Sequence, residues 1–352
     1  TTTLAPSAIL PPEAGLCGVV GGTPARWGKI ASAYAEPHIT YRGSRMADFN
    51  WYKGNLHTHT TESDGDADPE VVVEWYKKHD YDFLVLSDHN HRTILEHEDV
   101  DGPMMVPGEE VSARISGGGV PIHLNGIGIS RVVEPTDAGG VVQTLQANID
   151  AILDAGGIAQ LNHPNGAWAF DQEEIVQVQG ASLLEVYNGW PGANSEGGPG
   201  KHSAEEIWDG VLSAGKVIFG VATDDAHHYS DFSHVMANPG RGWVMVEAEE
   251  LTQDAIIESL QTGRFYFSTG INLARIEMSE NLVSLEIVQD RDYVYQTRFI
   301  GRDGVMLSEG DGLEASYDIG GDEGYVRASV LSSYGTRAWT QPIFIPVWTA
   351  TT

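Results

Sequence analysis

Short apolar segments that end in histidine or carboxylate side chains recur along this chain of 352 residues. One of them, at 82–86, has the pattern of a buried strand and runs directly into Asp88 and His89. Helical patterns lie between several of these segments, notably at 141–155 and 204–214. Alternating strands and helices predict an α/β fold with a parallel sheet. In α/β barrels the carboxyl ends of the strands carry the chemistry, so we expect these polar side chains to meet there.

The polar residues at these strand ends are of the types that bind divalent metal ions. His57 and His59 lie two apart in a predicted strand at 51–60, so both point to one face and can approach one ion. A carboxylate has two oxygens and can bridge two ions, whereas an imidazole serves one. The remaining candidates are Asp64, His89, Glu110, His123, His163, Asp225 and His227. A single histidine is more often structural, but this succession of suitable residues predicts a metal cluster.

These residues resemble the motifs of the PHP (polymerase and histidinol phosphatase) superfamily of metal-dependent phosphoesterases. The matching motifs lie in order within residues 50–270: His57-Thr58-His59 with Asp64, Ser87-Asp88-His89, Gly108 to Glu110, His123, Asn162-His163-Pro164, and Asp225 with His227. The resemblance implies a distorted (β/α)7 barrel over residues 46–270. It also implies a trinuclear site at the barrel mouth, with two or three divalent metal ions.

The resemblance assigns the ligands position by position. It gives the first ion His57, His59, Glu110 and Asp225; the second Glu110, His123 and His163; and the third Asp64, His89 and His227. Glu109 and Asp224 directly precede two of these ligands, and the spacing of the family motifs selects the second member of each pair. Asp64 stands where some members of the family carry histidine, which changes the ligand set of the third ion.

The predicted chemistry is hydrolysis of a phosphate ester, a monoester or diester of a small molecule, by a metal-activated hydroxide. Manganese, zinc and iron all accept mixed imidazole and carboxylate ligands, so the sequence does not select among them. One alternative is an amidohydrolase-type enzyme that attacks carbon, although the bridging lysine usual in that superfamily has no clear counterpart here. A second alternative is a binding protein stabilised by its metals.

Residues near the predicted ligands are candidates for catalysis and substrate binding. His91 and His228 flank predicted ligands and could act as general acid, and Arg114 could contact the phosphoryl oxygens. Further substrate-binding candidates lie in predicted loops: Arg92, Asn188, Lys201 and His202. For each of these residues the alternative is an ordinary solvated or structural side chain.

The two ends of the chain differ in pattern from residues 46–270. Residues 271–352 alternate short apolar and polar segments with Gly- and Asp-rich turns, which predicts a small antiparallel module resembling a β-sandwich. Its expected strands lie at 281–288, 293–300, 312–319, 325–331 and 341–347. Residues 1–45 are rich in Pro, Gly and Ala and predict an extended arm or an extra β element, with a strand at 38–41.

The chain is strongly acidic, with a net charge of −30. Such a surface repels nucleic acid and anionic membranes, which favours a small-molecule substrate. The sequence has no run of 18 or more apolar residues, so no membrane span is expected. Cys17 is the only cysteine and cannot form an intramolecular disulfide. The acidic surface and the β module favour export over a cytoplasmic location, and the oligomeric state is left open.

Overall fold

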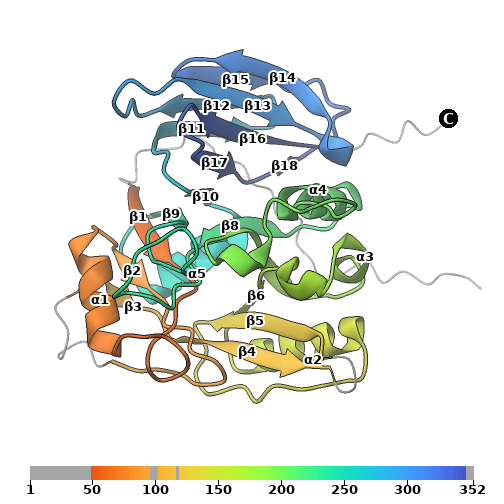
Figure 1. Ribbon diagram of the computed structural model, residues 1–352. Helices are drawn as coiled ribbons and strands as arrows, with labels where there is room; N and C mark the ends of the chain where they lie inside the picture. Colours follow the sequence, from red (N-terminus) through yellow and green to blue (C-terminus); the bar gives the residue numbers. More distant parts are fainter. Residues whose placement is uncertain (1–48, 96–101, 116–118, 346–352) are drawn as a thin grey trace, which may run out of the picture. The chain divides into compact units, whose positions relative to one another are not determined.

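The computed structural model of this chain describes residues 49–95, 102–115 and 119–345. The arm expected at 1–45, its strand at 38–41 and Cys17 lie outside the described residues. The fold is mixed α/β, and the described strands form three sheets (Figure 1). The α/β class predicted from the sequence is therefore confirmed.

The two helices expected at 141–155 and 204–214 are both present, and the structure adds further helices. Ser203 caps one of them: its hydroxyl accepts from the Glu206 amide, and the Glu206 side chain accepts from the Ser203 amide, so exposed helix-end groups are satisfied. The α-helices are α1 (Pro69–Lys78), α2 (Val141–Asp154), α3 (Gln172–Ile175), α4 (Ala204–Ser213) and α5 (Gln253–Thr262). Three short 3-10 helices add η1 (Gly166–Trp168), η2 (Pro191–Ala193) and η3 (Arg302–Gly304).

One sheet holds five strands in chain order. These are β4 (Gly108–Arg114), β5 (Pro121–Ile127), β6 (Ile158–Leu161), β7 (Ala181–Asn188) and β8 (Phe219–Thr223). The last three strands are parallel, as expected where helices connect them. The first three are antiparallel, and β4 and β5 are joined by a connection too short for a crossover. The prediction of a parallel sheet is therefore wrong for this half of the sheet.

A larger sheet carries the first strands of the described chain. Three of them are parallel: β1 (Asn50–Asn55), β2 (Phe83–Leu84) and β3 (Met104–Met105). On the other side of β1 the sheet continues antiparallel through β9 (Trp243–Ala248) and β10 (Phe265–Ser268). Helix α1 lies between β1 and β2 in the chain, and α5 lies between β9 and β10.

The two sheets meet at the ends of their strands without forming one closed ladder. Isolated bridges join Thr58 to Ala226 and His89 to Glu110, and all four residues lie at or beside predicted metal ligands. Among the described residues these strands therefore belong to two separate sheets, and their pairing does not close a barrel. The meeting point nevertheless brings the carboxyl ends of β1, β2, β6 and β8 towards β4.

The strands of residues 273–344 are all antiparallel. They are β11 (Leu273–Ser279), β12 (Leu282–Ile287), β13 (Tyr295–Ile300), β14 (Met306–Asp311), β15 (Glu314–Asp318), β16 (Tyr325–Ser332), β17 (Arg337–Thr340) and β18 (Ile343–Phe344). Strands β11, β12 and β15 make a separate sheet. The others continue the large sheet, because β17 pairs with β10. The sequence does not predict β11, β14 or β17, but the five strands expected here all have counterparts.

Buried polar and aromatic contacts hold these strands on the α/β part. The guanidinium of Arg327 on β16 is fully buried and reaches Asp209 on α4, with Nη2 2.7 Å from Oδ2. Gln341 exchanges two hydrogen bonds with the backbone of Gly220 on β8. Phe267 and Trp339 stack with ring centroids 4.9 Å apart. The hydrophobic core therefore continues from the α/β sheets into the C-terminal strands.

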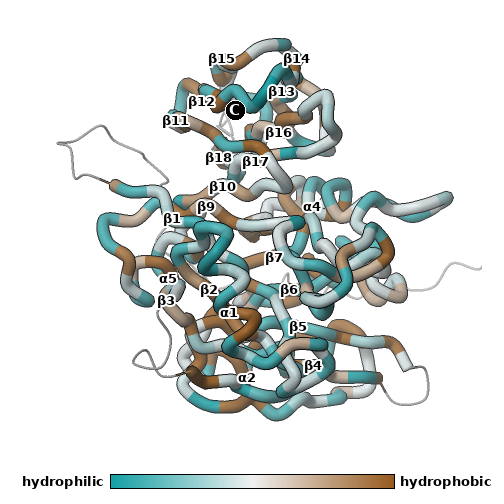
Figure 2. The backbone as a smooth tube through the Cα atoms, turned by 60° about the vertical axis from the view of Figure 1, so that its left-hand side comes forward, coloured by the Kyte–Doolittle hydropathy of each residue, from teal (hydrophilic) through white to brown (hydrophobic). Residues whose placement is uncertain are grey.

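Many apolar side chains are buried in the core, whereas the edge strand β14 is mostly exposed and largely hydrophilic (Figure 2). Helix α2, for example, buries Leu145, Ile149 and Ile152 in the main core. No helix of the described residues has the length and apolar character needed to cross a membrane.

Candidate metal centre

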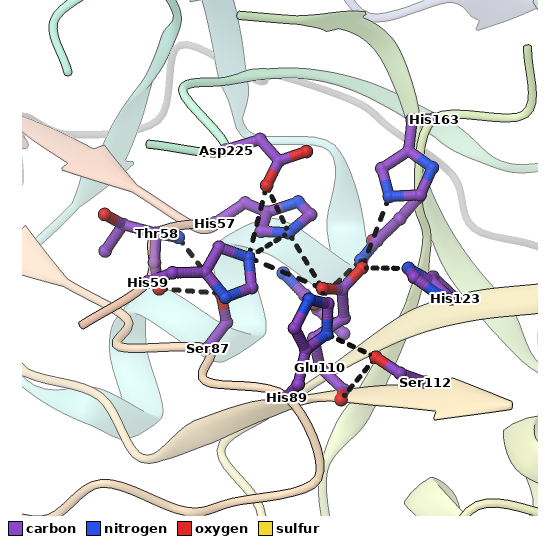
Figure 3. A network of polar contacts seen from close by, with 12 residues as sticks. His57, Thr58, His59, Ser87, His89, Glu110, Ser112, His123, His163 and Asp225 are labelled. Carbon is purple, nitrogen blue, oxygen red and sulfur yellow. Dashed lines mark hydrogen bonds and ion pairs between the residues drawn. The ribbon is translucent and has the colours of Figure 1, made fainter. Parts of the chain in front are cut away.

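All nine predicted metal ligands converge at the strand ends where the two sheets meet. His57 and His59 directly follow β1, and His89 follows β2. Glu110 and His123 lie on β4 and β5, and His163 follows β6. The end of β8 delivers Asp225 and His227, and a turn after β1 delivers Asp64. Figure 3 shows seven of these side chains pointing toward one another: His57, His59, His89, Glu110, His123, His163 and Asp225.

Glu110 lies at the centre of the cluster and is almost completely buried. Its Oε1 is 3.0 Å from His123 Nδ1 and 3.3 Å from His163 Nε2. Its Oε2 is 2.9 Å from His89 Nδ1 and 3.4 Å from His59 Nε2. The two oxygens of one carboxylate thus face different imidazoles, which is the arrangement that a bridging ligand requires.

His57, His59 and Asp225 form a second focus of the cluster. The Nε2 atoms of His57 and His59 are 3.2 Å apart, and each lies 3.2 Å from Asp225 Oδ1. Asp225 has a positive φ of 48°, a conformation that most residues adopt only under constraint from their surroundings. Its amide donates to the carbonyl of His57, which ties the two strand ends together.

Asp64 completes the cluster on its exposed side. Its carboxylate lies 3.2 Å from His227 Nε2 and 3.5 Å from His89 Nε2. Together with His59 these residues offer four donor atoms within 4.8 Å of one another. Asp64 is 55% exposed, whereas Asp225 is only 4% exposed, so the two ends of the cluster differ in access to solvent.

The donor atoms fit divalent metal ions. Asp225 Oδ1 and His123 Nδ1 are buried without a hydrogen-bond partner among the described residues, although both face other ligand atoms. Buried polar atoms are normally satisfied, and a bound cation would satisfy these. The compatible groups are His57 with His163 and Asp225, His57 with His59 and Glu110, His89 with Glu110 and His123, and His59 with Asp64, His89 and His227. His163 thus approaches His57 and Asp225 as well as Glu110. Geometry alone therefore does not divide the ligands as the family resemblance does.

Burial and neighbouring charges shift the pKa values of His59 and Glu110. For His57, His89, His163 and His227, burial would lower the pKa, but neighbouring carboxylates outweigh it and raise the pKa. Burial lowers the pKa of His59 to about 4, and His227 adds to the effect, so this imidazole is neutral near pH 7. Burial would raise the pKa of the Glu110 carboxyl, but the imidazoles of His123 and His57 outweigh it and hold that pKa well below its usual value. A neutral imidazole and an ionised carboxylate are the forms that bind metal.

Glu185 on β7 is a buried carboxylate that the sequence does not single out. Its Oε1 lies 2.7 Å from His57 Nδ1 and accepts from the Thr223 hydroxyl, also at 2.7 Å. Its Oε2 accepts from the backbone amide of His163 at 2.6 Å and from Asn188 Nδ2 at 2.9 Å. A carboxylate behind a ligating histidine fixes its ring orientation and tautomer. The only signal in the sequence is that Glu185 follows a short apolar segment.

Asp88 positions the turn that carries Asp64. Its carboxylate accepts from the backbone amide of Thr60 at 2.7 Å and from the hydroxyl of Ser63 at 2.7 Å. Because Ser63 directly precedes Asp64, these bonds fix the segment from which the exposed ligand projects.

Glu109 and Asp224, which precede predicted ligands, point away from the cluster. The carboxylate of Glu109 accepts from the Val133 amide, and burial raises its pKa to about 7. The carboxylate of Asp224 accepts from the hydroxyl of Tyr76 and from the amides of Arg241 and Gly242. On β4 this follows from side-chain alternation, because consecutive residues of a strand face opposite sides.

A cavity of about 480 Å³ opens onto the cluster, and two of the predicted catalytic residues line it. These are Arg114, whose Nη1 also donates to the carbonyl of Gly119 at 2.8 Å, and His228. The walls of the cavity also include Trp190, Val235 and Ala237.

The other predicted catalytic and substrate-binding residues do not line this cavity. His91 lies 3.5 Å from the Glu62 carboxylate, and the ammonium of Lys201 lies 5.5 Å from the ring centroid of Trp168. The His202 carbonyl accepts from Asn165 Nδ2. Arg92 is half-buried, and its Nε lacks a hydrogen-bond partner among the described residues. Asn188 lies behind the cluster, with its Nδ2 3.1 Å from Asp225 Oδ2.

No protein-family model matches this chain, and no curated protein sequence matches it. Solved structures do. PHP-like metal-dependent phosphoesterases, the family that the motifs resemble, are among them. One is a two-domain protein containing a predicted PHP-like metal-dependent phosphoesterase from Bacteroides vulgatus, which is 17% identical with a TM-score of 0.47, and the match covers 80% of this chain and 90% of that one.

Two other similar structures come from different enzymes. The lesion-specific endonuclease PfuEndoQ from Pyrococcus furiosus is 13% identical with a TM-score of 0.38, over 60% of this chain and 56% of that one. An amidohydrolase from Chromobacterium violaceum is 15% identical with a TM-score of 0.34, over 53% of this chain and 93% of that one. At such identities and TM-scores, a function for this chain has to come from the geometry of its own site.

Proposed function

We propose that this protein is a metal-dependent hydrolase that cleaves a phosphate ester of a small molecule, either a monoester or a diester. The observation that supports this proposal is the central position of Glu110, whose two oxygens face separate imidazoles at the floor of an open cavity. We further propose that residues 46–270 are an opened version of the distorted (β/α)7 barrel, and that residues 271–352 form its appended β module.

The nine converging residues would hold two or three divalent ions, with Mn, Zn and Fe all compatible with the donors. When bound, such ions activate water as a nucleophile and neutralise charge on the phosphoryl oxygens. Histidines and carboxylates from separate strand ends fix the positions of the donor atoms, and Glu185 holds the ring of His57 in place.

Arg114 and His228 would act on the substrate itself. A guanidinium has donors beyond the one that Arg114 gives to Gly119, and these can bind phosphoryl oxygens. The imidazole of His228 lines the same cavity and can donate a proton to the departing oxygen of the ester. His91 is the weaker candidate for this role, because it faces Glu62 outside the cavity.

A small molecule fits this site better than a nucleic acid does. A net charge of −30 repels polyanions at long range, whereas a small ester needs only the local field of the ions and Arg114. For attack at carbon the usual bridging lysine is missing, since no lysine lines the cavity among the described residues. The amidohydrolase alternative therefore gains no support from the site.

Metal analysis and matched substrates test the proposal. Purified protein should contain divalent metal and should release nitrophenol from nitrophenyl phosphate mono- or diesters. The His57→Ala and Asp225→Asn variants should lose both metal and turnover. His79→Ala is the matched control, because His79 is an exposed histidine stacked on Trp75 away from the cluster. Unchanged metal content and turnover in His57→Ala would show that the site is assigned wrongly.

A further inference from the structure

Trp190 forms an aromatic wall of the cavity above the candidate metal centre. Its indole is 40% exposed, and its ring centroid lies 5.9 Å from that of His163 at an interplanar angle of 71°. Among the described residues that line the cavity, it is the only aromatic side chain other than histidine. The large apolar ring of Trp190 is thus partly exposed to solvent and directly contacts the ring of His163, a candidate metal ligand.

Hydrogen bonds from the site itself hold the backbone of Trp190. Its amide donates to Asn188 Oδ1 at 2.8 Å, and Asn188 Nδ2 donates to the carboxylates of Glu185 and Asp225. The following loop is joined to the segment before η1, where Asn165 Nδ2 donates to the carbonyl of Asn194 at 3.1 Å. The indole is therefore presented from a segment that is fixed relative to the ligands.

Gly192 leaves room for the indole in this position. A Cβ atom at Gly192 would lie only 2.4 Å from the nearest indole atom, so any larger residue would push the ring away. The close packing of Gly192 on one part of the ring leaves the rest of the indole to line the cavity. The absence of a side chain at Gly192 therefore allows the indole of Trp190 to keep this position.

The surroundings of Trp190 favour an uncharged group over an anionic one. Arg114 is the only arginine or lysine that lines the cavity among the described residues. Val235, Ala237 and Pro121 add apolar surface. A second phosphate or a carboxylate on the substrate would find no further permanent cation, whereas a flat apolar group can stack on an indole.

We propose that Trp190 determines substrate specificity by stacking against the leaving group, so that the site prefers phosphate esters whose leaving group carries a flat, uncharged aromatic ring. The proposal rests on the function proposed above and names the substrate class of that site. Arg114 and the metal ligands then bind the phosphoryl group, and Trp190 selects the organic group attached to it.

The test compares two substrates that differ in ring planarity. Benzyl phosphate and cyclohexylmethyl phosphate both release a primary alcohol of similar bulk, but only the first has a flat ring. They are used as monoesters or as methyl diesters, whichever class the nitrophenyl series favours. The measured quantity is the ratio of the two kcat/KM values, which cancels any general loss of activity in a variant. We expect the wild-type ratio to favour the benzyl ester by about threefold to tenfold.

Four variants separate stacking from packing. The preference should persist in Trp190→Phe, which keeps a ring, and disappear in Trp190→Leu, which keeps only apolar bulk. It should also shrink in Gly192→Val, which displaces the indole without removing it. Trp168→Leu is the matched control, because Trp168 is 38% exposed nearby but does not line the cavity, and its ratio should equal that of the wild type.

A wild-type ratio near one, or a ratio that survives in Trp190→Leu, would overturn the proposal. So would an equal loss of the preference in Trp168→Leu. If the leucine variant does not fold, the phenylalanine and Gly192→Val variants still decide, because stacking requires the ratio to persist in the first and shrink in the second. A protein that turns over no phosphate ester would overturn the proposed function itself, a result distinct from turnover without a ring preference.

Discussion

His57 Nδ1 lies 2.7 Å from Glu185 Oε1, and both side chains are fully buried. The contact leaves the other ring nitrogen of His57 facing His59 and Asp225. Glu185, which is not itself a candidate ligand, therefore determines that Nε2 of His57 is the nitrogen available to an ion.

Replacing Glu185 by Gln should weaken metal binding without removing any ligand. The carboxylate receives five donors, from His57, Gln160, Thr223, Asn188 and the His163 amide, and a glutamine amide would turn an NH2 group toward some of them. Loss of such a partner typically reduces metal affinity or activity by about 10- to 100-fold. Metal titration and kcat measurements would show this loss. Glu258→Gln, at an exposed ion pair with Arg264, is the control, and equal metal affinity in both variants would contradict the assigned role.

Replacing Asp64 should cause a smaller loss of bound metal and turnover than replacing Asp225. Asp64 belongs only to the group with His59, His89 and His227, and it is largely exposed. Asp225 is buried and contacts both histidines of the opening motif. We therefore expect Asp64→Ala to lower the metal content by one ion per chain and to leave residual turnover. Asp225→Asn should remove more metal than Asp64→Ala does and should reduce kcat/KM by at least about 100-fold.

Elemental analysis of the purified variants measures this difference directly. Asp254→Asn, an exposed acidic residue of α5, controls for loss of surface charge. Equal metal loss in the Asp64 and Asp225 variants would argue for one cooperative cluster in place of separable ions.

Most of the nine candidate ligands could be predicted to converge because they follow apolar segments that can be recognised by themselves. Asp64 is the exception, because it lies in a polar turn and is identified only by its place in the family motif. His89 directly follows a buried run, and His57 and His59 share one face of a strand. Glu185 also follows such a segment, but a lone glutamate matches no motif, and its role depends on which histidine lies opposite. That contact joins residues 128 positions apart, and no local pattern encodes it.

The sheet arrangement was harder to predict for a different reason. Strands β2 and β3 contain only two residues each, so periodicity does not reveal which neighbours they pair with. The antiparallel pairing of β4 with β5 depends on a short connection that resembles any other turn. The positions of Lys201 and His202 depend on a long loop anchored by Asn165, a side-chain contact that the sequence does not predict.

Arg327 should be essential for the junction between the C-terminal strands and α4. Its buried guanidinium pairs with Asp209 and Glu205, and Tyr325 also donates to Asp209. Arg327→Met would leave the buried Asp209 carboxylate without its positively charged partner, and breaking a buried ion pair typically costs about 3–5 kcal/mol of unfolding free energy. Urea unfolding followed by fluorescence measures the change.

The exposed pair of Arg298 with Glu309 provides the control for this prediction. Arg298→Met should cost no more than about 1 kcal/mol, because exposed ion pairs contribute little. A similar small effect for Arg327→Met would show that the junction is held by its apolar contacts alone.

The Glu205 carboxyl should make stability depend on pH in the acidic range. Burial would raise the pKa of Glu205, but the neighbouring Arg327 guanidinium outweighs it and holds the pKa below its usual value. The unfolded chain therefore binds a proton more readily than the folded one, and the contribution of Glu205 is complete above its unfolded pKa of about 4.3. It is lost as the pH falls through the lower folded value. The difference in unfolding free energy between wild type and Glu205→Gln should thus be constant from about pH 6 to 8 and shrink below about pH 4. Urea unfolding across this range measures it, and a difference that grows toward low pH would contradict the depressed pKa.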